Sequence, residues 1–285
     1  MKILNYCRKL LQPYRDKQHF RQFLKNVPSI ELMDNINKLS NTIEKKSILK
    51  VVGCGPSANE AFNSCKDYDY MVVNAYSVMP EYPNYKPKYY VVTDIAFFTS
   101  PDYAYVWHKI IDDTDWEMYF FVPVELQTPE LDAEFIKNQH IKMVYFNGNT
   151  YYYGPENKRD YCYDHNLAMP NPYNVMIGCL YIGISLGYKT IKMYGVEYDM
   201  VRDLHVDKNN HPYFTARHCY DSNLTGEETD VKDDPCTQTV EQILSGFVNT
   251  MKSHREIQNI AKRKGTQIWN CTKESLIDVY DRLTQ

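Results

Sequence analysis

Ile48-Leu-Lys-Val-Val-Gly-Cys-Gly-Pro-Ser57 is the stretch that decides the fold. Its apolar run ends in Gly53-Cys54-Gly55-Pro56-Ser57, which predicts a strand, a tight turn and then a helix over Ala58 to Cys65. Glycines let the backbone approach a ligand closely, and a helix N-terminus attracts anions. The stretch therefore favours a bound phosphate, although a glycine turn without a ligand stays open. It is neither a dinucleotide fingerprint nor a P-loop, because no third glycine and no Gly-Lys-Ser/Thr follow.

Seven apolar runs, rich in Val, Ile, Tyr and Phe, predict strands. They lie at 48–52, 69–75, 88–93, 117–124, 141–146, 190–196 and 266–270. The clearest helical patterns between them are Val175 to Gly187 and Thr237 to Lys264, each with a glycine where it stops. Strands that alternate with helices predict an α/β fold: a single Rossmann-like, mostly parallel sheet with helices on both faces.

The predicted Rossmann-like domain spans residues 48–285; one further segment precedes it and two interrupt it. Residues 1–47 form a predicted basic helical extension, and residues 147–173 and 200–236 are polar, lid-like insertions. Residues 1–26 carry seven basic residues against one acid, so we expect an amphipathic helix that contacts an anionic membrane surface or packs on the main domain with a solvated basic face. Pro13 predicts a kink or a break in that helix.

Composition bounds the partners and the compartment. The net charge of −4 argues against nucleic-acid binding, and the eight cysteines show neither a C-x-x-C pair nor zinc spacing. No signal peptide and no run of 18 apolar residues is visible, which favours a cytoplasmic protein, at the inner face of the cell membrane if residues 1–26 touch it. The oligomeric state is left open.

Ligands of parallel α/β sheets bind at the carboxyl ends of the strands. The residues expected there are Gly53 to Ser57, Asn74, Asp94 and Gly195 to Asp199. Glu197 and Asp199 are two apart and would share one side of an extended chain. With Asp94 they predict an acidic cluster that binds a metal ion, takes part in acid–base chemistry, recognises sugar hydroxyls, or caps loops and pairs with Arg202 or Arg217.

In order along the chain, Gly53-Cys54-Gly55-Pro56-Ser57, Asn74, Asp94-Ile-Ala-Phe-Phe98 and Gly187-Tyr-Lys…Gly195-Val-Glu-Tyr198 resemble bacterial sialyltransferases of glycosyltransferase family 42 over roughly residues 48–280. The chain is also similar to a wider set that includes hydroxymethylpterin pyrophosphokinase-like proteins. The resemblance implies an inverting glycosyltransferase without metal or other cofactor. It would move a sialic-acid-like or other sugar from a nucleotide donor such as a CMP-sugar to a surface glycan acceptor.

The same resemblance implies the positions of the donor site. The glycine turn would lie beside the nucleotide phosphate, and Asn74 would face the donor. Asp94 stands where the family has Asn, Asn174-Val175-Met176 replaces the family's Thr-Ser-Gly, and Asp199 takes the place of its phosphate-binding tyrosine, with Tyr198 adjacent. These departures bear on the identity of the donor sugar.

An inverting transferase needs a base for the acceptor hydroxyl, and imidazole exchanges protons near neutral pH. His218 is the first candidate, with Tyr220 as a nearby donor, because the family keeps its catalytic histidine in this insertion; His254 in the long helix is the rival. Tyr151, Tyr152 and Tyr153 form a lid or acceptor platform, or simply pack the insertion.

Other functions remain open at this point. A pyrophosphokinase-like phosphate-transfer enzyme would use ATP and magnesium, with Asp94, Glu197 and Asp199 as ligands. A nicotinamide or methyl-donor protein is disfavoured, because Asn74 stands where an acidic residue should end the second strand. A non-catalytic scaffold on the same fold is the last alternative.

Overall fold

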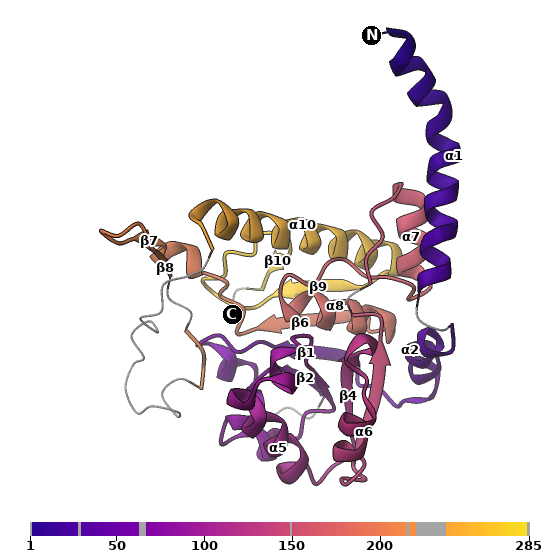
Figure 1. Cartoon of the computed structure of the whole chain (residues 1–285). Helices are drawn as coiled ribbons and strands as arrows, with labels where there is room; N and C mark the ends of the chain where they lie inside the picture. Colours follow the sequence, from indigo (N-terminus) through magenta and orange to yellow (C-terminus); the bar gives the residue numbers. More distant parts are fainter. Residues whose placement is uncertain are drawn as a thin grey trace.

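The centre of the molecule is an eight-stranded sheet (Figure 1). The computed structural model describes residues 2–27, 30–62, 67–148, 150–214, 217–220 and 238–283. The strand order is β10-β9-β6-β1-β2-β3-β4-β5, and every neighbouring pair is parallel. The strands are β1 (Ile48–Val52), β2 (Tyr68–Val73), β3 (Tyr89–Val91), β4 (Met118–Pro123), β5 (Ile141–Phe146), β6 (Thr190–Tyr194), β9 (Gln267–Asn270) and β10 (Asp281–Arg282). The predicted α/β class is confirmed, and each of the seven predicted strands is present.

Helices cover both faces of this sheet. In Figure 1, α10 lies above it and α5 and α6 lie below, while α8 packs against α10, β1 and β3. The helices are α1 (Lys2–Asn26), α2 (Ile30–Thr42), α3 (Tyr82–Tyr85), α4 (Ala96–Thr99), α5 (Ala104–Asp113), α6 (Pro129–Phe135), α7 (Glu156–Asp164), α8 (Val175–Ser185) and α10 (Val240–Lys264). This double cover explains why central strands read as continuous apolar runs: all six residues of β4 are buried.

The predicted long C-terminal helix forms as its sequence signals indicate. Thr239 and Gln242 form a capping box at the start of α10. Gly265, at φ 68°, ends the helix in the left-handed conformation that glycine adopts without strain.

The helix predicted directly after the glycine turn is wrong as to length and type. Residues Ala58–Ala61 form a single turn of 3-10 helix, η1, which ends at Phe62 in extended conformation, and residues 63–66 lie outside the described part of the chain. The Phe62 ring stacks on Tyr85 at 3.7 Å and on Tyr70 at 4.9 Å between ring centroids. These contacts hold the Phe62 ring against the main domain at the end of η1.

The N-terminal extension is helical, as predicted. Helix α1 continues through Pro13 without interruption, so the predicted break does not occur. Phe20 and Phe23, near its end, contact the ring of Tyr152 at 5.4 and 5.0 Å, while its first half projects away from the body (Figure 1). Among the described residues, no helix is long and apolar enough to span a membrane.

The first insertion, residues 147–173, is tied to the body. It contains α7, whose Asp160 pairs with Arg263 of α10 at 2.9 Å, and whose Arg159 pairs with Glu256 of α10 at 3.5 Å. Several contacts of this kind hold a segment better than one surface ion pair does.

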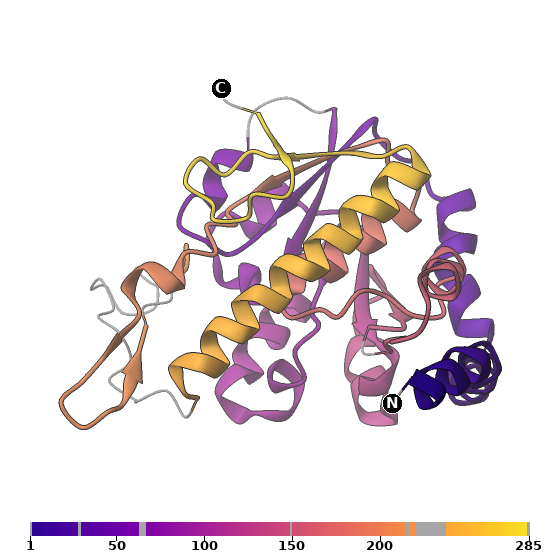
Figure 2. The same ribbon diagram turned by 90° about the horizontal axis from the view of Figure 1, so that it is seen from above.

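The second insertion, residues 200–236, begins with a 3-10 turn (η5, Met200–Asp203) and a small antiparallel hairpin. Strands β7 (His205–Val206) and β8 (Pro212–Tyr213) project from the body, as Figure 2 shows. The chain then returns to the sheet, where the Cys219 N–H donates to the Cys54 carbonyl at 2.7 Å. Residues 215–216 and 221–237 lie outside the described residues.

The strand order reverses at β1. Strands β2 to β5 extend from one side of β1, whereas β6, β9 and β10 extend from the other. In open α/β sheets the crevice at this reversal, beyond the carboxyl ends of the strands, is where ligands bind.

Candidate active site

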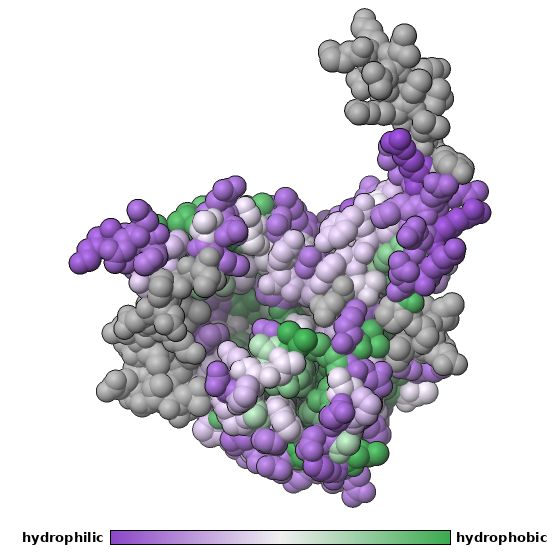
Figure 3. Space-filling model, viewed as in Figure 1, coloured by the Kyte–Doolittle hydropathy of each residue, from purple (hydrophilic) through white to green (hydrophobic). Residues whose placement is uncertain are grey.

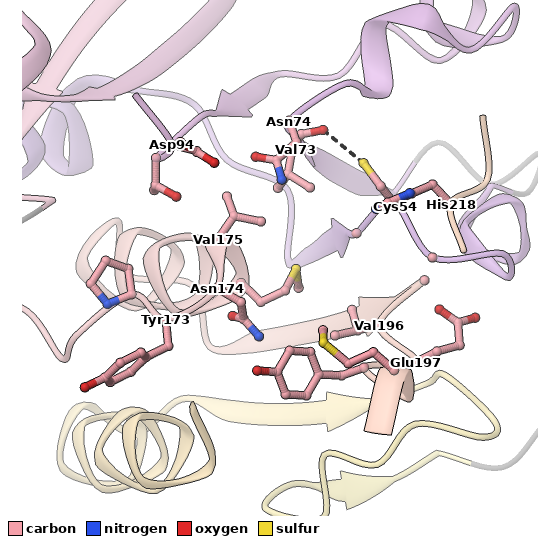
Figure 4. Close-up of a pocket in the computed structure, with 18 of the residues that line it drawn as sticks. Cys54, Val73, Asn74, Asp94, Tyr173, Asn174, Val175, Val196, Glu197 and His218 are labelled. Carbon is pink, nitrogen blue, oxygen red and sulfur yellow. Dashed lines mark hydrogen bonds between the residues drawn. The ribbon is translucent and has the colours of Figure 1, made fainter. Parts of the chain in front are cut away.

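A cavity of about 480 Å³ occupies this position. It lies beyond the carboxyl ends of β1, β2, β3 and β6, with residues 172–176 and 217–218 completing its walls. Figure 4 shows Cys54 and His218 together at one end and Tyr173 at the other. In Figure 3 the surface beneath α10 is hollowed and carries hydrophobic side chains, while the β7–β8 hairpin is hydrophilic. The volume is within the range of small-ligand sites.

The structure brings most of the predicted donor-site residues to this cavity. Those that line it are Gly53, Cys54, Gly55, Asn74, Asp94, Asn174, Gly195, Glu197, Tyr198, Asp199 and His218. Pro56, Ser57, Tyr220 and His254 are not among the lining residues.

The glycine turn does not offer its N–H groups to a phosphate in the expected way. The N–H of Gly53 donates to the carbonyl of Tyr194 at 2.8 Å, and that of Gly55 donates to the carbonyl of Gly195 at 2.9 Å. The N–H of Ser57 donates to the Glu197 carboxylate at 2.9 Å. The turn therefore shapes the cavity wall and joins β1 to β6.

Glu197 acts as a structural cap of this turn. Its Oε1 accepts from Ser57, and its Oε2 is buried beside Gly55 without a hydrogen-bond partner among the described residues. A Cβ on Gly55 would lie 1.7 Å from Oε2, so only glycine leaves room for the carboxylate. Of the open interpretations of Glu197, loop capping is the one that these contacts support, because Arg202 pairs with Glu274 and Arg217 pairs with Asp203.

The segment after β6 is not extended, so the reasoning that placed Glu197 and Asp199 on one side does not hold. β6 ends at Tyr194, and Gly195 (φ 61°) and Tyr198 (φ 49°) both turn the chain. The Tyr198 hydroxyl donates to Thr250 of α10 at 2.7 Å, and burial raises the pKa of Tyr198. Tyr198 thus links the cavity wall to α10 as a neutral side chain.

Asn74 carries an unused acceptor at the cavity. It directly follows β2, in the left-handed conformation (φ 49°) that asparagine tolerates better than most residues. Its backbone is held, because its N–H donates to Val91 and its carbonyl accepts from Tyr90 at 2.7 Å. Its side-chain Oδ1 is buried and has no hydrogen-bond partner among the described residues. Such groups are uncommon in native structures, and here the atom belongs to a residue that lines a ligand-sized cavity.

The helix N-terminus at this cavity is that of α8. Asn174 is its N-cap, with Oδ1 accepting from the Ile177 N–H at 3.3 Å. Val175 and Met176, the first two helical residues, line the cavity. The first N–H groups of a helix have no intrahelical partner, and the helix dipole adds positive potential there. An anion in the cavity therefore meets donors at α8 that it does not meet at the glycine turn.

His218 lies at the cavity wall beside Cys54. Its imidazole stacks on the Tyr220 ring, with centroids 4.9 Å apart and planes 5° from parallel, so Tyr220 positions the imidazole. A hydrogen bond to the Cys219 thiol, followed by burial, raises the pKa of Cys54. Cys54 is therefore a neutral thiol and a poor nucleophile.

His254 lies elsewhere, in the core beneath α10. It is fully buried, and its Nδ1 lies 2.9 Å from the Tyr280 hydroxyl. Burial lowers its pKa to about 3, so it stays neutral in the folded protein. The structure thus separates the two predicted histidines, and only His218 faces the cavity. His205 and His211, in the projecting hairpin, are exposed.

The charged groups around the cavity are partly engaged with the protein itself. The Asp94 carboxylate accepts from the Ala96 N–H at 2.9 Å, and Arg217 pairs with Asp203 at 3.0 Å. Within the described ranges, no group of three or more His, Cys, Asp or Glu side chains is placed to hold a metal ion.

Some lining residues carried no signal in the sequence. Pro172 and Tyr173 are distant in sequence from Thr93 but meet it here. Tyr173 stands next to the N-cap Asn174, and that adjacency was the one available indication of its position.

Comparison with known proteins finds that the chain is similar to several solved structures. No protein-family model matches the chain, and no curated protein matches it. The chain is similar to the sialyltransferase CstII from Campylobacter jejuni in complex with CMP-3FNeuAc, with 15% identity and a TM-score of 0.45 over 85% of this chain and 87% of that one. The cytidine-5'-monophosphate complex of CstII gives 14% identity and a TM-score of 0.46, with the same coverage. The alpha-2,3-sialyltransferase from Campylobacter jejuni in apo form gives 14% and 0.41, over 85% of each chain. Values in this range leave every residue role to be derived from this chain's own geometry.

Proposed function

We propose that this protein is a glycosyltransferase that moves a sugar from a nucleotide donor to a glycan acceptor. The observation that carries the proposal is the cavity at the reversal of the strand order, which is lined by the N-terminus of α8, by Asn74 with its unpartnered Oδ1 and by His218. The sequence motifs, which resemble those of glycosyltransferase family 42, name a CMP-linked sugar as the donor class.

In this proposal the donor phosphate lies at the N-terminus of α8. The N–H groups of Val175 and Met176 and the amide of Asn174 stabilise the phosphate as it leaves. Asn74 Oδ1 accepts a hydrogen bond from a hydroxyl or amino group of the donor.

His218 is the proposed base. It removes the proton of the acceptor hydroxyl as that oxygen attacks the sugar from the face opposite the phosphate, which inverts the anomeric centre. Tyr220, stacked on the imidazole, fixes the ring plane for this transfer.

The test is calorimetric titration of the full chain with CMP, UMP, AMP and GMP in the presence of EDTA. We expect CMP to bind more tightly than about 1 mM, or better than about −4 kcal/mol, and the purines more weakly. CMP release from CMP-N-acetylneuraminate is then followed with and without added oligosaccharides. No binding of any nucleotide tighter than millimolar would overturn the proposal, and binding of ATP that requires magnesium would favour the phosphate-transfer alternative.

A location at the inner face of the cell membrane is also part of the proposal, with residues 1–26 as the contact. The charge of this segment carries it, with seven basic residues against one acid. Co-sedimentation with vesicles of 30% phosphatidylserine, as against pure phosphatidylcholine, tests it on the full chain. Equal recovery with both vesicles would contradict an electrostatic contact.

A further inference from the structure

A second, smaller cavity of about 160 Å³ adjoins the first. Tyr151 and Tyr173 line both, so the two spaces share a wall. The second cavity lies between the first insertion and α10. We call it the tyrosine groove, after the side chains that characterise it: Tyr151, Tyr153, Tyr173, Asn171, Asn249 and Lys252. It is too small for a drug-sized ligand, and its size suits one subsite that continues from the main cavity.

The mouth of the groove is formed by aromatic rings that are unusually open to solvent. Tyr153 is 76% exposed and Tyr173 is 47% exposed. Asn171 holds Tyr153 by donating to its hydroxyl at 3.4 Å, and Tyr151 packs edge-on against Tyr153 with centroids 6.3 Å apart. The rings are thus positioned rather than loose, and each presents an apolar face beside a hydroxyl group.

The floor of the groove contains a polar atom that lacks a partner. Nε of Arg159 is buried and has no hydrogen-bond partner within the described part of the chain. Tyr152 also lines the groove, with its hydroxyl against Gly154 and its ring supported by Phe20 and Phe23 of α1. A buried donor is normally paired in native structures, so Nε of Arg159 can donate to a hydroxyl group of a ligand.

The charge of the groove selects against cations. Arg159 pairs with Glu256 at 3.5 Å, and Glu256 also accepts from the Tyr163 hydroxyl at 2.7 Å. Lys252 is exposed, donates to Asn249 at 3.2 Å and makes no ion pair with a described acid. The positive charge of Lys252 is thus not neutralised by a described acid, and it lies beside the aromatic rings and amides of the groove.

From this geometry we infer that the tyrosine groove is an acceptor subsite, which holds a sugar ring of the acceptor other than the one whose hydroxyl reacts. Its ligand is a hydroxyl-rich sugar of an oligosaccharide: the ring packs on Tyr153, and its hydroxyl groups meet Asn249, Lys252 and the floor. The inference rests on the proposed function, because it assigns the second substrate of the same reaction. The groove adjoins the main cavity at Tyr173, whereas the reacting hydroxyl meets His218 at the other end of that cavity.

The test uses an array of printed neutral and sialylated oligosaccharides, probed with the full chain in the presence of CMP. The glycan that binds most strongly is then titrated by calorimetry into four proteins: wild type, Tyr153→Ala, Asn249→Ala and Tyr105→Ala. Tyr105 is a matched control, because it is an exposed tyrosine (40%) on α5, outside the groove. CMP affinity and melting temperature are measured on the same samples.

We expect Tyr153→Ala and Asn249→Ala to weaken glycan binding about tenfold or more. Tyr105→Ala should bind as wild type, and all four proteins should bind CMP equally, because neither groove residue lines the main cavity. Glycan binding unchanged in both groove variants, or no array glycan bound by the wild type, would overturn the inference while CMP binding stands. If the wild type does not bind CMP, that result would instead overturn the proposed function.

Discussion

The contact between Gly55 and Glu197 allows a quantitative prediction. A Cβ at position 55 would lie 1.7 Å from Glu197 Oε2 and 2.8 Å from the Gly195 carbonyl oxygen. Gly55→Ala must therefore push the carboxylate aside and break its hydrogen bond to the Ser57 N–H. A hydrogen bond to a charged group contributes about 1.5–3 kcal/mol, and crowding against Gly195 adds to the loss. Glu197→Ala removes the same hydrogen bond by truncation.

Because both substitutions remove one shared interaction, their effects should not add. We expect the double variant to be more stable than the sum of the two single losses by about 1.5–3 kcal/mol. The assay is urea unfolding of the four proteins of this cycle. Gly246→Ala is the matched control: nothing lies within 4 Å of the added Cβ, so it should stabilise α10 by up to about 1 kcal/mol and be additive with Glu197→Ala. Additivity of Gly55→Ala and Glu197→Ala within about 0.5 kcal/mol would refute the capping role.

Three further predictions concern the histidines and Asn74. His218→Ala should lower turnover by about two orders of magnitude or more with an unchanged melting temperature, and normal turnover would remove His218 as the base. His254 has a folded pKa of about 3 against an ordinary value of 6.5, so the unfolded chain binds more protons below pH 6.5. Stability should therefore fall by about 2 kcal/mol between pH 7 and pH 5, and a His254→Leu variant whose urea-derived stability keeps that slope would contradict the burial argument. Asn74→Ala should weaken CMP-sugar binding more than CMP binding in paired titrations, because its free Oδ1 awaits a donor group on the ligand; equal losses would place Asn74 on the nucleotide.

The fold could be predicted from local pattern to a large extent. The apolar run at 117–124 contains β4 (Met118–Pro123), because a strand buried on both faces is apolar along its whole length. The end of α10 at Gly265 was equally predictable, since glycine adopts the left-handed conformation of a helix C-cap without a Cβ penalty. The length of η1 was not predictable, because it depends on the ring of Phe62 meeting Tyr85, a contact made through the folded sheet.

For the candidate site, the strand pattern was enough to predict which residues meet at the carboxyl edge of the sheet. Gly53, Asn74, Asp94 and Gly195 follow parallel strands, and parallel strands bring their carboxyl ends to one edge. Residues from insertions, such as Tyr173 and Tyr153, followed no strand periodicity and could be placed only by the packing of α7 against α10.

The glycine turn at residues 53–57 shows both kinds of feature. Its sequence predicts that a tight turn ends the first strand. The hydrogen-bond partner of each N–H and the position of an anion could not be predicted from it. The folded chain brings the Ser57 N–H to a carboxylate 140 residues away and places the N-terminus of α8 at the cavity. A backbone donor binds whichever acceptor the fold brings closest, and sequence distance does not enter that choice.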